Sequence, residues 1–289
     1  MNLSINHIEW IDKTTRLDQL LEQHTSFTTE TMNQGTEAEV IKVCAPQESF
    51  VLKVWNKVHE PDIQLQYQLL LLLAERGLAV PEPLGWGTNE HGNKVLLTTF
   101  DGDAIENLNN ASMRAFAHIL QSIHQLDVQN IAEVSFPVYE FKAYFFSEAQ
   151  AYPDLTATLK LLFDHVQIRQ DRIIHGDFHM ENIIEKNGDF TVIDWTNVQV
   201  GDDRYDVAWS TLLMKIYISD SKAATFQSAY WEETETDQDE IDVFEAFACV
   251  RWLLLYRLDR VPLRQKTIQN VKRTIARNPF LKEWLISAT

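Results

Sequence analysis

Short apolar runs separated by polar turns predict strands in the first third of the chain. Residues 39–43 (EVIKV) and 49–55 (SFVLKVW) are rich in β-branched and aromatic residues, and a segment of Pro and polar residues separates them. Residues 95–100 (VLLTTF) form another such run. Between residues 55 and 95, a long apolar pattern predicts a helix that begins near Pro61 and stops at Gly77, because Pro suits a first turn and Gly a C-terminal cap.

Beyond residue 102 the spacing of apolar residues becomes mostly helical. Residues 115–126 (AFAHILQSIHQL) follow this pattern, and it returns from Asp206 to the end. The exception is residues 173–194, where Asn187-Gly188 between two apolar runs is a strong signal of a β-hairpin. We therefore expect an α+β protein of two lobes: a strand-rich N-terminal lobe at residues 1–97, a hinge at 98–102 and a larger helical lobe at 103–289.

Charge and cysteine content narrow the classes of function. The 289 residues include 42 acidic and 25 basic ones, so the formal net charge is −17. This charge argues against nucleic-acid binding and disfavours anionic membrane surfaces. Two cysteines, Cys44 and Cys249, support neither a disulfide framework nor a Cys-based zinc site. With no recognisable targeting segment and no apolar run near the ~20 residues of a membrane span, we expect a cytoplasmic protein.

The hairpin region carries the candidate chemistry. Asp177 is followed by Asn182 five residues later and by Asp194 twelve residues after that. Asn182 begins the first expected strand and Asp194 ends the second, so the hairpin should bring both to one end. A carboxylate and an amide oxygen suit Mg²⁺ bridging substrate phosphates. Asp177 could accept a proton from an attacking hydroxyl, as phosphoryl transfer requires.

Three motifs in this region carry a resemblance to a known family. The segments HGDFHMEN, VIDW and GDDRYDVAW occur in this order within residues 175–209. They resemble the aminoglycoside phosphotransferase and choline kinase family, and weaker similarities extend over roughly residues 34–212. The resemblance implies a bilobal protein-kinase-like fold and an ATP- and Mg²⁺-dependent kinase that phosphorylates a hydroxyl of a small molecule.

The resemblance also implies roles for individual residues. Asp177 matches the catalytic base, and Asn182 and Asp194 match the Mg²⁺ ligands. Lys53 matches the lysine that contacts the α- and β-phosphates, while Gln66 occupies the position of its usual glutamate partner, for which Glu60 is an alternative. The remaining matches are Gly35 and Thr36 in the phosphate-covering loop, Thr98, Thr99 and Phe100 in the adenine-binding hinge, and Asp206 as a structural aspartate.

Several alternatives stay open. Gln66 in place of glutamate favours a kinase-like nucleotide-binding protein with weak or regulatory activity. His175 and His179 beside Asp177 permit a metallohydrolase, although supporting motifs are absent. A protein kinase lacks support because no Ala-Pro-Glu segment follows Asp194. The acidic segment 231–245 holds eight acids, which either cap and solvate a helix or bind a cationic, aminoglycoside- or choline-like acceptor.

Overall fold

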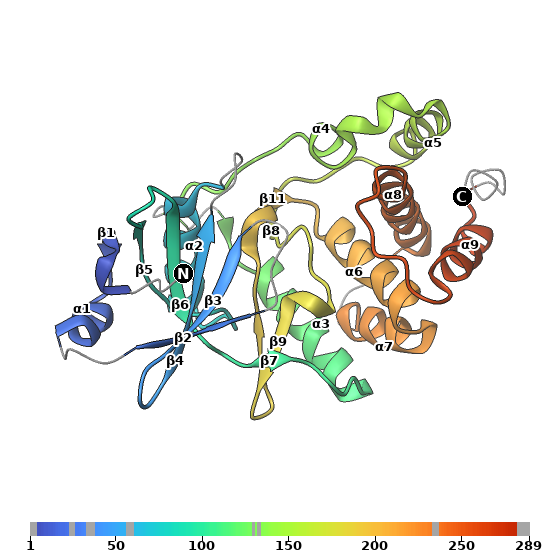
Figure 1. Cartoon of the computed structure of the whole chain (residues 1–289). Coiled ribbons are helices and arrows are strands. Elements are labelled where there is room, and N and C mark those ends of the chain that lie inside the picture. The colour runs from blue at the N-terminus through green and yellow to red at the C-terminus, as the bar shows by residue number, and fades with distance from the viewer. Residues whose placement is uncertain are drawn as a thin grey trace. The chain divides into compact units, whose positions relative to one another are not determined.

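The computed structural model forms two compact units (Figure 1). The N-terminal unit comprises residues 1–105 and 183–196, and the C-terminal unit comprises residues 106–182 and 197–289. This division differs from the expected boundaries because the 183–196 hairpin joins the N-terminal unit. The structure describes residues 5–22, 27–32, 38–55, 61–128, 131, 134–232 and 237–281.

A six-stranded antiparallel sheet forms the centre of the N-terminal unit, in the order β1-β5-β6-β4-β3-β2. The strand runs expected from the sequence are confirmed as β3, β4 and β6. Helix α2 packs against β5 and β6. The elements are β1 (Glu9–Lys13), α1 (Thr15–Glu22), β2 (Thr28–Thr31), β3 (Glu39–Cys44), β4 (Ser49–Trp55), α2 (Ile63–Glu75), β5 (Pro83–Thr88) and β6 (Lys94–Thr99).

The alternation of side chains along β4 explains where the candidate lysine lies. Phe50, Leu52 and Val54 are buried in an apolar cluster that also includes Leu17 of α1. Because successive strand residues point to opposite faces, Lys53 lies on the other face of the sheet. The sheet's register fixes the position of Lys53 along this face, and its neighbours across the two adjoining strands are Val40 and Leu96.

The expected α2 helix is confirmed, and its ends follow local chemistry. The Asp62 side chain caps the N-terminus by accepting a hydrogen bond from the Leu65 N–H at 3.0 Å. The chain leaves the helix through Gly77, whose φ of +73° is the left-handed conformation that glycine adopts readily.

The expected hairpin is confirmed as β9 (Ile183–Lys186) and β10 (Asp189–Val192). Both turn residues, Asn187 and Gly188, have positive φ, as a type I′ turn requires. The strand β7 (Asp103–Ala104) pairs with β9 in a three-stranded sheet, which explains why the hairpin belongs to the N-terminal unit.

The C-terminal unit is mainly helical, as expected, and its core is rich in aromatic side chains from α4, α6 and α8. No helix in the described part of the chain is long and apolar enough to cross a membrane. The main elements of the C-terminal unit are α3 (Asn110–His124), α4 (Phe141–Phe146), α5 (Pro153–Phe163), β8 (Arg172–Ile174), β11 (Gln199–Gly201), α6 (Asp203–Tyr217), α7 (Asp220–Tyr230), α8 (Gln238–Arg257) and α9 (Thr267–Arg277).

Replacing Gly102 tests the close approach between β7 and β9. Gly102 has φ +129°, and a Cβ there would lie 2.0 Å from the Glu185 carbonyl oxygen. We expect Gly102→Ala to lower the free energy of unfolding by about 3 kcal/mol, since backbone strain and overpacking add. Urea unfolding followed by circular dichroism measures this loss.

The matched control for this test is Gly92→Ala. Gly92 also has a left-handed φ, +77°, but a Cβ there meets nothing within 4 Å. This control should lose only about 1–2 kcal/mol, the cost of the left-handed conformation alone. Equal losses for the two variants would contradict the packing that we assign to Gly102.

Candidate active site

A buried carboxylate holds the loop that carries the candidate catalytic residue. Asp206 on α6 is fully buried and accepts hydrogen bonds from the backbone N–H groups of His175, at 2.8 Å, and Gly176, at 3.0 Å. The His124 ring lies 3.1 Å from the same carboxylate and 2.6 Å from the Tyr230 hydroxyl. Asp206 therefore has the structural position that the resemblance implied.

The loop makes a tight turn at Gly176 before it reaches Asp177. Gly176 has φ +79°, and a Cβ there would lie 2.6 Å from the Asn197 carbonyl oxygen. The buried His175 accepts a hydrogen bond on Nδ1 from the Asp177 N–H at 3.3 Å. His175 thus orients the loop from within the protein, and the turn fixes the direction in which Asp177 leaves it.

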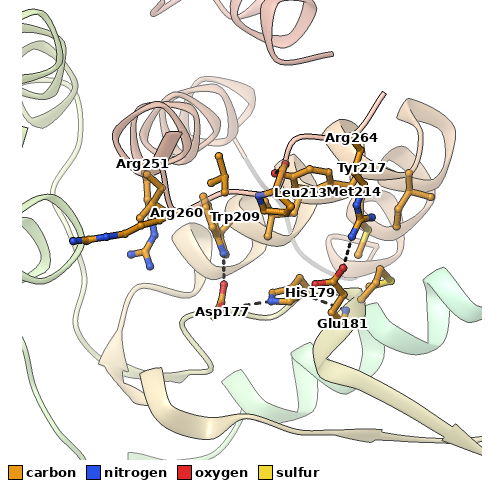
Figure 2. Close-up of a pocket in the computed structure, with 15 residues that line it drawn as sticks. Asp177, His179, Glu181, Trp209, Leu213, Met214, Tyr217, Arg251, Arg260 and Arg264 are labelled. Carbon is orange, nitrogen blue, oxygen red and sulfur yellow. Dashed lines mark hydrogen bonds and ion pairs between the residues drawn. The ribbon is translucent and has the colours of Figure 1, made fainter. Parts of the chain in front are cut away.

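The Asp177 carboxylate is held by two side chains (Figure 2). The Trp209 indole N–H donates to Oδ1 at 2.8 Å, and His179 Nε2 lies 3.4 Å from Oδ2. Burial alone would raise the pKa of Asp177, but the His179 and Trp209 contacts outweigh it and lower this pKa to about 2. The carboxylate is therefore ionised at neutral pH.

Asn182 lies beside Asp177 in the same unit. It ends a short 3₁₀ helix (Met180–Asn182), and its Nδ2 donates to the Asp177 carbonyl oxygen at 3.0 Å. With the nitrogen turned toward the loop, the side-chain oxygen is the atom left for a metal ion. An amide oxygen is a hard ligand of the kind that Mg²⁺ prefers. The structure thus brings together two of the three residues of the expected catalytic set.

The third residue, Asp194, belongs to the N-terminal unit. It follows β10 with φ +65°, and its Oδ1 accepts a hydrogen bond from the Thr196 hydroxyl at 3.1 Å. The Trp195 indole N–H donates to the Val192 carbonyl at 3.1 Å, which folds the chain back after the strand. Asp194 is therefore presented from a fixed turn, and its carboxylate also fits a hard metal ion.

The expected lysine and its helix partner also lie in this unit. Lys53 is half-buried and forms no ion pair within the described residues. Gln66 on α2 is 8% exposed, and its buried Nε2 finds no hydrogen-bond partner there either. The phosphate-loop residues Gly35 and Thr36, and the alternative partner Glu60, fall outside the described residues.

The expected hinge backbone is partly engaged within its own unit. The Thr99 N–H donates to the Glu82 carbonyl at 2.9 Å, and the Phe100 N–H donates to the Ser49 carbonyl at 3.1 Å. The Phe100 carbonyl accepts a hydrogen bond from Lys186 at 3.2 Å. Thr98 is buried on β6. The Thr99 N–H and the Phe100 N–H and carbonyl therefore already have partners within the N-terminal unit.

A pocket of about 230 Å³ opens beside Asp177 within the C-terminal unit (Figure 2). Sequence reasoning noted Asp177 and His179 but missed the other lining side chains. Signals existed for Met180 and Glu181, which lie within the HGDFHMEN motif, and for Trp209, which ends the GDDRYDVAW motif. The lining residues are Asp177, His179, Met180, Glu181, Trp209, Leu213, Met214, Tyr217, Ile218, Arg251, Leu255, Arg260, Val261, Pro262 and Arg264.

Solved structures with similar folds include phosphotransferases in complex with small molecules. An amicoumacin kinase in complex with AMP-PNP, Ca²⁺ and its antibiotic is 16% identical, with a TM-score of 0.63 over 94% of this chain and 97% of that one. The aminoglycoside phosphotransferase APH(4)-Ia with ADP and hygromycin B is 15% identical, with a TM-score of 0.61 over 91% and 97%. A spectinomycin phosphotransferase with ADP and spectinomycin is 15% identical, with a TM-score of 0.57 over 96% and 98%.

These similarities confirm the protein-kinase-like fold expected from the sequence. No protein with a curated description matches the chain. The model of the phosphotransferase enzyme family (APH) matches residues 28–244, which is most of the chain and includes the Asp177 loop, the hairpin and Asp206. The chain therefore belongs to the phosphotransferase enzyme family.

Proposed function

We propose that this protein transfers the γ-phosphoryl group of ATP to a hydroxyl of a small molecule, with Mg²⁺ as cofactor. The observation that carries the proposal is the ionised Asp177 carboxylate, fixed by Trp209 and His179 at a pocket large enough for a small substrate. ATP is supported by the AMP-PNP and ADP in the complexes of similar kinases. A small-molecule acceptor is supported by the antibiotics in the same complexes.

The low pKa of Asp177 defines its part in the reaction. A carboxylate with a pKa of about 2 is a weak base, so it does not remove the hydroxyl proton early. Phosphoryl transfer passes through a loose transition state that needs positioning more than it needs a strong nucleophile. Asp177 therefore accepts a hydrogen bond from the acceptor hydroxyl, directs its oxygen at the phosphorus, and takes the proton late, as the new bond forms.

The remaining residues hold the nucleotide. Asn182, through its side-chain oxygen, and Asp194, through its carboxylate, bind the metal ion, and Lys53 contacts the α- and β-phosphates. Bound Mg²⁺ neutralises charge on the phosphates. Gly35 and Thr36 cover the phosphates, the segment Thr98, Thr99 and Phe100 lies at the adenine, and Gln66 stands at the position of the helix partner of Lys53.

A second candidate function is nucleotide binding with weak or regulatory activity. The observation that favours it is Gln66, because a neutral amide cannot form the ion pair that normally fixes the nucleotide lysine. Asp177 and its two supporting side chains favour transfer instead. Measuring ATP turnover with a panel of hydroxyl compounds, with and without Mg²⁺, separates the two functions.

Asp177→Asn tests the assigned catalytic residue. An amide keeps the shape of the side chain but cannot take the hydroxyl proton. We expect kcat to fall by roughly 10²–10⁴-fold while the KM for ATP changes little, because the carboxylate acts in the chemical step. Steady-state kinetics measure both constants, and near-normal turnover would refute the assignment.

Trp209→Phe tests whether Trp209 positions Asp177. The change keeps an aromatic ring in the buried site but removes the N–H that donates to Asp177. We expect kcat to fall about tenfold or more, because a hydrogen bond to a charged group contributes about 1.5–3 kcal/mol. The KM for ATP should stay unchanged. Trp86→Phe, in the buried part of β5, is the control for shortening a core tryptophan, and an equal loss of kcat there would argue against positioning.

Asp194→Asn tests the metal ligand without disturbing the backbone. Asn tolerates the left-handed conformation of this position, so the variant removes only the charge. We expect Mg²⁺-dependent nucleotide binding to weaken by about tenfold or more, because a neutral amide replaces the carboxylate ligand. Calorimetry with Mg²⁺ and AMP-PNP measures this. Asp189→Asn, on the exposed start of β10, should leave binding intact; unchanged binding in both variants would make Asp194 purely structural.

A further inference from the structure

Arginines gather in the pocket beside Asp177, although the chain as a whole is strongly acidic. Arg251, Arg260 and Arg264 line the pocket, while its carboxylates are Asp177 and Glu181. The whole chain has 42 acidic residues against 25 basic ones. The local charge therefore runs against the overall composition, which points to a specific role for the pocket arginines.

Two of these arginines already have protein partners. Arg264 forms an ion pair with Glu181. Arg260 holds both carboxylate oxygens of Glu148, at 2.6 and 3.2 Å. Both pairs are largely exposed to solvent. Their positive charges are locally balanced, so they contribute to the walls of the pocket more than to its net charge.

Arg251 on α8 is different. It is half-buried, and within the described residues its guanidinium forms no ion pair, while its buried Nε has no hydrogen-bond partner. The guanidinium lies 4.4 Å from the centre of the Phe145 ring and 5.1 Å from that of Trp209. These two aromatic faces stabilise the cation and hold its orientation. Figure 2 shows Arg251 on one side of Asp177 and the Arg264–Glu181 pair on the other.

Arg251 does not serve as the direct partner of Asp177. The oxygens of Asp177 are already contacted by Trp209 and His179, and Arg251 acts on this carboxylate only through space. Asp177 offsets the charge of Arg251 only through space, so no carboxylate among the described residues pairs with its guanidinium. A guanidinium offers parallel N–H donors that match a carboxylate or a phosphate. The group that fits Arg251 is therefore an anion entering the pocket.

We propose that the phosphoryl acceptor carries a carboxylate that pairs with Arg251 while its hydroxyl lies at Asp177. This inference rests on the proposed function. Trp209 contacts both ends, because its N–H donates to Asp177 and its ring lies under Arg251, so a short carbon skeleton spans them. The apolar side chains of Leu213, Leu255 and Val261 line the same pocket and suit that skeleton.

This acceptor has the opposite charge to the one that the acidic segment suggested. Among the described acids of that segment, Glu232 and Asp237 do not line the pocket. Asp237 instead caps α8 by accepting a hydrogen bond from the Asp239 N–H at 3.0 Å. Glu233 and Glu235 fall outside the described residues. The guanidinium of Arg251, unpaired among the described residues, and not the described acids of that segment, thus lines the pocket and favours an anionic group at its end.

The test uses hydroxyl compounds that differ only in the charge of one terminal group. One set is 4-hydroxybutyrate, butane-1,4-diol and 4-aminobutan-1-ol; a second is gluconate, glucitol and glucamine. Binding is measured by calorimetry and thermal shift in saturating Mg²⁺ and AMP-PNP, and transfer is measured with Mg²⁺ and ATP. We expect the anionic member of at least one set to bind more tightly than its neutral and cationic counterparts.

Variants then assign this preference to Arg251. Arg251→Gln should weaken binding of the preferred anion by roughly tenfold or more, without changing the KM for ATP, because it removes a charged partner of the acceptor alone. Arg251→Lys keeps the charge but loses the paired donors, so it should recover part of the affinity. Arg277→Gln removes an exposed cation outside the pocket and should change nothing. Circular dichroism checks that each variant is folded.

The other possible results distinguish failure of this inference from failure of the proposed function. Preference for neutral or cationic compounds, or no anion-selective binding that Arg251→Gln removes, overturns the inference. A raised KM for ATP in Arg251→Gln, with acceptor binding unchanged, would mean that Arg251 contacts a phosphate of the nucleotide instead. Transfer to uncharged acceptors alone would leave the proposed function intact and reject only the anionic acceptor. Anion binding without any phosphoryl transfer would support the anion site at Arg251 and reject the proposed function.

Discussion

The candidate site depends on one buried charge, the carboxylate of Asp206. A fully buried carboxylate would be strongly destabilising unless donors surrounded it. Here the backbone N–H groups of His175 and Gly176 and the ring of His124 meet this need. The same contacts fix the loop in a turn that forces Gly176 into the left-handed region. The position of Asp177 is therefore a consequence of how the protein satisfies Asp206.

Side chains on one face of α6 contact successive parts of the loop that carries Asp177. Asp206, Trp209 and Ser210 are spaced by three and four residues, so they lie on the same side of the helix. Asp206 holds the loop backbone before Asp177, Trp209 holds the Asp177 carboxylate, and the Ser210 hydroxyl donates to the Phe178 carbonyl at 2.7 Å. A single rigid helix thus positions three successive parts of the loop, which explains why the motif around Asp206 is so informative in the sequence.

Features that depend on local contacts could be predicted from the sequence, whereas features that depend on long-range contacts could not. The Asn187-Gly188 turn and the apolar run that forms β4 are local, and both elements were predicted correctly. The pairing of β7 with β9 joins segments about eighty residues apart, so no local pattern indicated that the hairpin belongs to the N-terminal unit. Arg251 is likewise distant from Asp177 in sequence, and its helix has apolar residues on most sides, which conceals a pocket-lining arginine.

The arginines of the pocket also show why net charge is a poor guide to substrate. A charge of −17 describes the surface as a whole and bears on solubility and long-range attraction. Charges exposed to solvent are screened within about 8 Å at physiological ionic strength. Arg251, half-buried between Phe145 and Trp209, is screened much less. On the proposal that its guanidinium pairs with the acceptor, this one oriented cation bears on substrate choice more than many distant carboxylates do.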